Sequence, residues 1–139
     1  MPGTISFATR RTPDERVAQL DGTGWVLWAS QQIAAATPER AVELLTPLRP
    51  LLVRSTNRLL TSLDETTSLP PASSDYWELA EDTLTLGTAA AVLAGLRSSA
   101  DVLPLVGEYS LAVQARSASD TLATQVRTNF GPNGYPRLL

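Results

Sequence analysis

The 139-residue chain contains no cysteine and no histidine, and all 11 of its cationic side chains are arginine. These absences exclude thiolate nucleophiles, Ser–His and Cys–His pairs and histidine-ligated zinc sites. The lack of lysine excludes Schiff-base chemistry. Carboxylates and tyrosines therefore remain as the side chains that could move protons.

The chain also lacks an excess of positive charge and a long apolar run. Its formal net charge is −3, which argues against nucleic-acid binding because a basic face is needed to neutralise phosphates. The longest apolar run, residues 89–96, is far shorter than the roughly 18 residues of a membrane-spanning helix. The pair Arg10-Arg11 is not followed by an apolar export segment. We expect a soluble, cytoplasmic protein with neither a nucleic-acid nor a membrane partner.

What is present indicates one all-α domain. The chain is 43% hydrophobic and 18% charged, as in globular proteins, and its length suits a single domain. Proline, glycine and apolar spacing predict helices at residues 24–36, 38–45, 46–63, 79–100 and 109–130. The predicted organisation is an extended arm (1–23), a first helical pair (24–63), a loop (64–78), a second helical pair (79–130) and a tail (131–139).

The predicted helices are of two kinds. Those at 46–63 and 109–130 are apolar on one face, which is typical of helices that cover a core. Those at 24–36 and 79–100 are apolar all round, which predicts burial on every side. The order is therefore inner, outer, inner, outer, and it indicates a layered helical assembly larger than this chain.

Small residues recur at four-residue steps on the second of the inner helices. Gly87, Ala91 and Gly95 form this stripe. A glycine inside a helix costs about 1 kcal/mol relative to alanine, so close packing of two backbones is the expected compensation.

An acidic and aromatic cluster precedes the same helix. Ser74-Asp75-Tyr76-Trp77-Glu78 is followed by Glu81 and Asp82. Aromatic faces can stack on sugar rings, and carboxylates bind hydroxyls and shuttle protons. Alternatively, the acids occupy the first turn of a helix, where negative charge is favoured, and the two aromatic residues are core anchors.

A second candidate is the glycine-containing segment that begins at Asp21. Gly22-Thr23-Gly24 matches half of a dinucleotide-binding fingerprint, but Leu27 stands where the third glycine belongs and no β/α pattern surrounds it. The stronger interpretation is a helix start with Asp21 or Thr23 as the N-cap residue.

Four segments, in this order along nearly the whole chain, resemble glycoside hydrolase family 15, the glucoamylase-like enzymes, and the last resembles its actinobacterial branch. They are QLDGTGWVLWA (19–29), PPASSDYWE (70–78), TLGTAAAVLAGL (85–96) and FGPNGYPRL (130–138). The resemblance implies an (α/α)6 barrel of alternating inner and outer helices, of which this chain is two helical hairpins.

The resemblance also implies roles for individual residues. Glu78 would be the general acid that protonates the glycosidic oxygen, and Asp75, Tyr76, Trp77 and Asp21 would bind the sugar. Trp77 and Glu78 should then line a concave pocket. The chemistry of the family requires two carboxylates and water, so it implies no metal and no organic cofactor.

The second carboxylate is the missing part. Inversion needs a base about 6.5–9.5 Å from the acid, and the family places it far downstream. The acids downstream of Glu78 in this chain include Asp101, Glu108 and Asp120, and none of them lies in a segment that matches the one around the family's base. The resemblance covers roughly the middle third of a barrel, so we expect hydrolysis of α-glucosidic or trehalose-type linkages only when other parts complete it.

Three interpretations follow. The chain is a piece of a larger polypeptide or complex, it self-associates so that copies supply the missing helices, or it is a non-catalytic structural or assembly subunit that reuses the scaffold. The expected partners are an oligosaccharide or glucoside and a protein that covers the apolar helices, either another protein or a second copy. In a four-helix unit each inner helix should keep one apolar face exposed.

Overall fold

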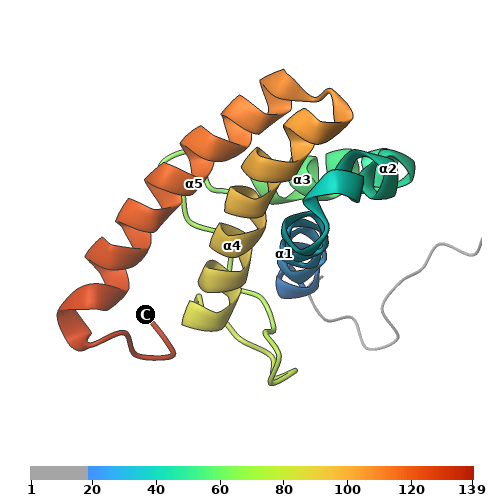
Figure 1. The fold of residues 1–139 in the computed structure, drawn as a ribbon. Helices are drawn as coiled ribbons and strands as arrows, with labels where there is room; N and C mark the ends of the chain where they lie inside the picture. Colours follow the sequence, from blue (N-terminus) through green and yellow to red (C-terminus); the bar gives the residue numbers. More distant parts are fainter. Residues whose placement is uncertain (1–18) are drawn as a thin grey trace, which may run out of the picture.

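Helices dominate the computed structural model, which describes residues 19–139 (Figure 1). In chain order they are α1 (Asp21–Ala36), α2 (Ala41–Leu45), α3 (Arg49–Ser62), α4 (Leu86–Val102) and α5 (Tyr109–Phe130). Short 3-10 helices lie at Pro38–Arg40, Thr46–Leu48, Leu103–Val106 and Gly131–Asn133. Between residues 19 and 139 no strand occurs, and the one extended pairing is an isolated antiparallel bridge between Thr85 and Leu138. The all-α prediction is confirmed.

Helix α4 is the centre of the packing. It lies between α1 and α5 in Figure 1 and contacts both, and α3 packs against the same core. The side chains of Val92 and Leu96 on α4 are fully buried, as are Leu27 of α1 and Leu59 of α3. Ala90 remains exposed, so α4 is not covered on every side.

The backbones of α1 and α4 touch at glycine and alanine. A Cβ atom at Gly24 would overlap the carbonyl oxygen of Ala91, and one at Gly95 would lie 2.7 Å from the Cα of Gly24. This contact confirms the close approach predicted for Ala91 and Gly95. Gly87, the third member of the stripe, faces the preceding loop instead, because its Cβ would meet the ring of Tyr76 at 3.0 Å.

Helix α1 begins earlier than predicted. It starts at Asp21, so Gly22 and Gly24 lie within the first turn and the prediction of a helix start at residue 24 was wrong. Asp21 is not the N-cap residue; its carboxylate accepts a hydrogen bond from the backbone N–H of Gly22 at 2.7 Å. Gly24 is explained by the contact with α4 rather than by a turn. The remainder of the predicted arm, residues 1–18, lies outside the described residues.

Helix α4 begins later than predicted, at Leu86 rather than Leu79. Thr85 caps it: its Oγ1 accepts a hydrogen bond from the backbone N–H of Thr88 at 3.1 Å. The C-terminal tail binds the backbone at the start of α4, because the N–H of Leu86 donates a hydrogen bond to the carbonyl of Arg137 at 2.7 Å. The acids at 75–82 therefore lie in a loop and not in the first turn of a helix.

The other helices match the sequence pattern closely. Helix α5 has the predicted bounds. The helices predicted at 38–45 and 46–63 are present, but each begins with a 3-10 turn, so that α2 starts at Ala41 and α3 starts at Arg49 and ends at Ser62. Gly107 and Gly134 adopt positive φ values of 82° and 73°, which end the 3-10 turns on either side of α5.

Among residues 19–139, one segment is long and apolar enough to cross a membrane, namely Leu86–Val106, which is α4 and the turn after it. Its most apolar window is 56% buried inside the protein, as is usual for the core helix of a helical domain. This segment is therefore only weak support for membrane insertion.

Candidate functional site

A tight turn presents the two aromatic residues of the acidic and aromatic cluster. The backbone N–H of Glu78 donates to the carbonyl of Asp75 at 2.8 Å, and that of Trp77 donates to Asp75 Oδ1 at 3.0 Å. The turn leaves the side chains of Tyr76 and Trp77 65% and 58% exposed, with their ring centroids 5.4 Å apart. Neither residue is the core anchor that one interpretation of the sequence proposed.

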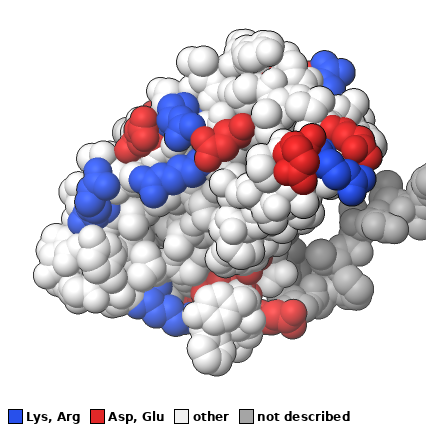
Figure 2. All heavy atoms as spheres, viewed as in Figure 1, with Lys and Arg blue, Asp and Glu red and all other residues white. Residues whose placement is uncertain are grey.

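The two rings form one side of a pocket of about 400 Å³. The N-terminal part of α4 and the C-terminal tail supply the rest of the lining. The lining residues are Tyr76, Trp77, Leu86, Gly87, Ala90, Tyr135 and Arg137. Figure 2 shows the charges on the face of the molecule that is seen in Figure 1. Charged side chains gather over α5 and beside α2, whereas the region over α1 and α4 is mainly uncharged.

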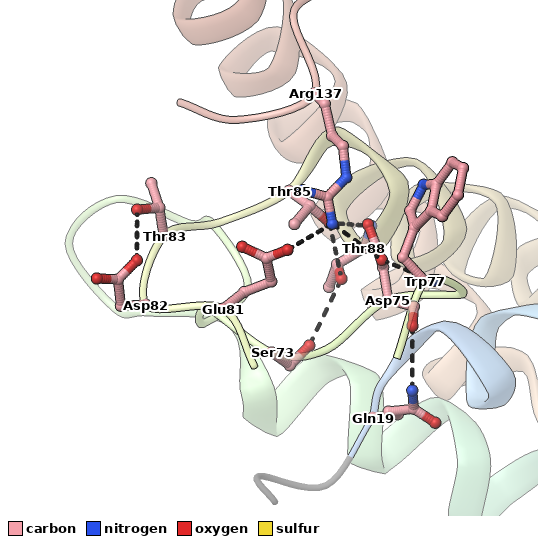
Figure 3. Close-up of polar contacts among 10 residues, drawn as sticks. All are labelled: Gln19, Ser73, Asp75, Trp77, Glu81, Asp82, Thr83, Thr85, Thr88 and Arg137. Carbon is pink, nitrogen blue, oxygen red and sulfur yellow. Dashed lines mark hydrogen bonds and ion pairs between the residues drawn. The ribbon is translucent and has the colours of Figure 1, made fainter. Parts of the chain in front are cut away.

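Asp75 lies beneath the pocket and holds its neighbouring segments in place. Its side chain is fully buried, and Arg137 from the tail approaches Asp75 Oδ1 at 3.4 Å while also pairing with Glu81 (Figure 3). On the opposite side, the amide of Gln19 donates to the backbone carbonyl of Asp75 at 3.1 Å. Asp75 thus connects three segments: its carboxylate holds the loop and the tail, and its backbone carbonyl holds the segment before α1.

The electrostatics keep this carboxylate ionised. Burial by itself raises the pKa of Asp75, but the backbone N–H of Trp77, the hydroxyl of Thr85 and Arg137 outweigh it and hold the pKa below its ordinary value. The second oxygen, Oδ2, has no hydrogen bond of good geometry and lies against Gly87. Arg137 is the only cation among these groups, and it adds its charge to the hydrogen bonds from the loop.

The structure brings together some of the predicted site residues and not others. Tyr76 and Trp77 line the pocket, and Asp75 supports it from beneath. Glu78 is exposed and is not among the lining residues, nor is Asp21, which is buried at the start of α1. Glu78 also has a positive φ of 55°, an unfavourable conformation for a residue with a Cβ atom.

Two lining residues were assigned no role from the sequence. Tyr135 and Arg137 belong to the tail, about sixty residues after the aromatic pair. Their segment, 130–138, is one of the four that resemble glycoside hydrolase family 15. Its position in the sequence does not indicate that it lies beside residue 75 in the fold. The one signal in the sequence is charge: Arg137 is the single cation after α5, so an ion pair between the tail and the acidic loop would involve this residue.

The lining of the pocket offers stacking surfaces and hydrogen-bond donors. The lining contains aromatic rings, small apolar groups and a guanidinium, but no Asp or Glu. Within residues 19–139 there is also no group of three or more acidic residues placed to hold a metal ion. A ring-shaped neutral ligand with hydroxyl groups suits these surroundings, because its flat face can stack while the guanidinium donates hydrogen bonds.

Comparison with known proteins adds no relative. No protein-family model, curated protein or solved structure matches this chain.

Proposed function

We propose that this chain is the sugar-binding part of a glycosidase of the family 15 type and that it does not hydrolyse glycosides on its own. The observation that carries the proposal is the pocket, which is lined by Tyr76, Trp77 and Tyr135 and has no carboxylate in its lining. The rings bind the faces of a glucosyl unit, and Arg137 donates hydrogen bonds to its hydroxyls.

The packing of the helices supports an (α/α)6 arrangement within this proposal. The two helices predicted to be inner, α1 and α4, contact one another most closely, and their glycines allow the approach. The amphipathic helices α3 and α5 lie against α4 and expose their charged sides. Alternating inner and outer helices would continue this order around a complete barrel.

Glu78 is the general acid in this proposal, and it acts only when further helices complete the site. It follows Trp77 directly, so a sugar stacked on that ring would bring its glycosidic oxygen toward the same turn. The base and the groups that exclude water come from outside the described residues. A general acid without a general base does not activate water for attack. The isolated chain should therefore bind the sugar without hydrolysing it.

Calorimetric titration with maltose and trehalose tests the binding. The Trp77→Ala chain should lose about tenfold in affinity, because a stacked ring contributes roughly 1–1.5 kcal/mol. Trp28→Ala is the matched control: it removes a half-exposed tryptophan of α1 that is far from the lining, and the affinity should not change. Equal losses in both variants, or no heat of binding in the unaltered chain, would contradict the proposal.

An assay of glucose release tests the absence of turnover. We expect none from maltose, trehalose or an aryl α-glucoside, at enzyme concentrations that reveal slow hydrolysis. Robust turnover that Glu78→Gln abolishes would show that the chain holds a catalytic base, and the binding-only assignment would then be wrong.

A non-catalytic assembly subunit is the second candidate. The observation that favours it is the exposed, uncharged side of α1, which is unrelated to the pocket. A chain that binds neither sugar, but associates through α1, would support this candidate over the first.

A further inference from the structure

One side of α1 is apolar, exposed and free of charge. The helix contains no Lys, Arg or Glu, and its single acid, Asp21, is buried at the first position. Trp25 and Trp28 are 45% and 43% exposed, and their rings meet edge to face with centroids 5.9 Å apart. We define the α1 face by its exposed or half-exposed residues: Trp25, Val26, Trp28, Ala29, Gln32 and Ile33.

The face lies on the side of the molecule away from α5. Helix α4 lies between α1 and α5 (Figure 1). Leu27 of α1 is fully buried in the core that includes Val92 and Leu96 of α4. Nothing within residues 19–139 covers Trp25 or Ile33, since both remain nearly half exposed. Two tryptophans, a valine and an isoleucine in one continuous exposed surface are unusual for an isolated domain.

The order of side chain sizes suits a second copy of the same helix. Trp25, Ala29 and Ile33 follow one another at four-residue steps and so lie in a row along the helix. If a twofold axis relates two α1 helices and passes at Ala29, the small alanine side chain lies where the two helices cross. Trp25 of each chain then packs beside Ile33 of the second copy.

The available area is that of a weak, specific dimer. With about 250 Å² for a whole tryptophan side chain, the exposed fractions of Trp25, Val26, Trp28 and Ile33 leave roughly 350 Å² uncovered. Ala29 and Gln32 extend this to roughly 500 Å² per copy, so a pair would bury about 1,000 Å², the lower limit for a biological interface. An uncharged face also needs a partner without charge, which a second copy supplies.

We infer that the chain forms a twofold homodimer through antiparallel α1 helices, with Ala29 at the crossing. The α1 face and the sugar pocket share no residue, so the two can be tested separately. An interface of this size is at the lower limit for specific contacts, so we expect monomer and dimer to exchange with protein concentration.

Sedimentation equilibrium over a wide range of protein concentration tests the association. The unaltered chain should approach twice its 14.9 kDa mass as the concentration rises into the tens of micromolar. Trp25→Glu and Ile33→Glu should each weaken the dimer more than tenfold, because each places a charge against an apolar side chain of the second copy. Val113→Glu is the matched control, since Val113 is 70% exposed on α5 and should leave association unchanged.

A single introduced cysteine tests the geometry of the axis. The chain has no cysteine, so Ala29→Cys can cross-link only to itself in a second copy. At a helix crossing the two Cα atoms come within disulfide range, and mild oxidation should convert most of this variant to a covalent dimer. Val113→Cys should stay largely uncrosslinked.

Several outcomes would overturn the inference. A monomer at all concentrations would show that another segment or another protein covers the α1 face. Oligomers that persist in Trp25→Glu, or equal cross-linking of the two cysteine variants, would place the contact elsewhere. Because sugar affinity is measured separately with Trp77→Ala, failure of the dimer leaves the proposed function untouched.

Discussion

Replacing Gly24 by alanine should lower the free energy of unfolding by about 3 kcal/mol or more, a large share of the 5–15 kcal/mol typical of a domain. The added Cβ would overlap the carbonyl oxygen of Ala91, which belongs to the backbone of α4 and cannot rotate away. The central pair of helices would have to separate, which would expose core side chains such as Leu27 and Leu96.

Gly22→Ala is the matched control for this prediction. It lies in the same turn of α1, but a Cβ there meets nothing within 4 Å. Alanine is the better helix former, so this variant should be neutral or up to about 1 kcal/mol more stable. Urea unfolding followed by circular dichroism measures both. Equal stability of the two variants would show that α1 and α4 do not cross at Gly24.

The second large effect is expected from Arg137→Met. This change leaves the fully buried carboxylate of Asp75 without its cation, and a buried charge that loses its partner is costly. Because Arg137 is 36% exposed, water weakens the pair, and we expect a loss of about 2–3 kcal/mol at neutral pH. Arg116→Met is the control: it breaks an ion pair with Asp101 in which both side chains are about half exposed, so it should cost less than about 1 kcal/mol.

The same pair predicts a dependence on pH. The folded protein holds the pKa of Asp75 below its ordinary value, so ionisation of Asp75 stabilises the fold above about pH 4 and this contribution disappears as the pH falls through the lowered pKa. The difference between Arg137→Met and the unaltered chain should therefore be largest near neutral pH and shrink in acid. Adding Asp75→Asn to Arg137→Met should recover part of the loss. A difference that grows in acid would contradict this account.

Local signals were sufficient for most of the helices. The bounds of α5 follow from its apolar spacing and from the Gly131-Pro132 stop, and α3 follows from the proline at its start. These segments were predictable because the residues that define them are neighbours in the chain. The tyrosine and tryptophan of the pocket were found for the same reason.

The errors arose where distant segments meet. Helix α4 begins at Leu86 because the backbone of residues 84–86 pairs with the C-terminal tail. The sequence of residues 79–85 contains no pattern from which this pairing could be predicted. Gly24 was interpreted as part of a turn because its partner, Ala91, lies 67 residues later in the sequence. The role of Arg137 depended on the same long-range closure.

The most direct test of the sugar site is a titration of the ¹⁵N-labelled chain with maltose, observed through its indole N–H signals. The chain has three tryptophans, and only Trp77 lines the pocket. The account predicts that the Trp77 signal shifts in a saturable manner, while those of Trp25 and Trp28 do not move. Saturable shifts of the α1 tryptophans with an unmoved Trp77 signal, or no shift of any indole, would contradict it.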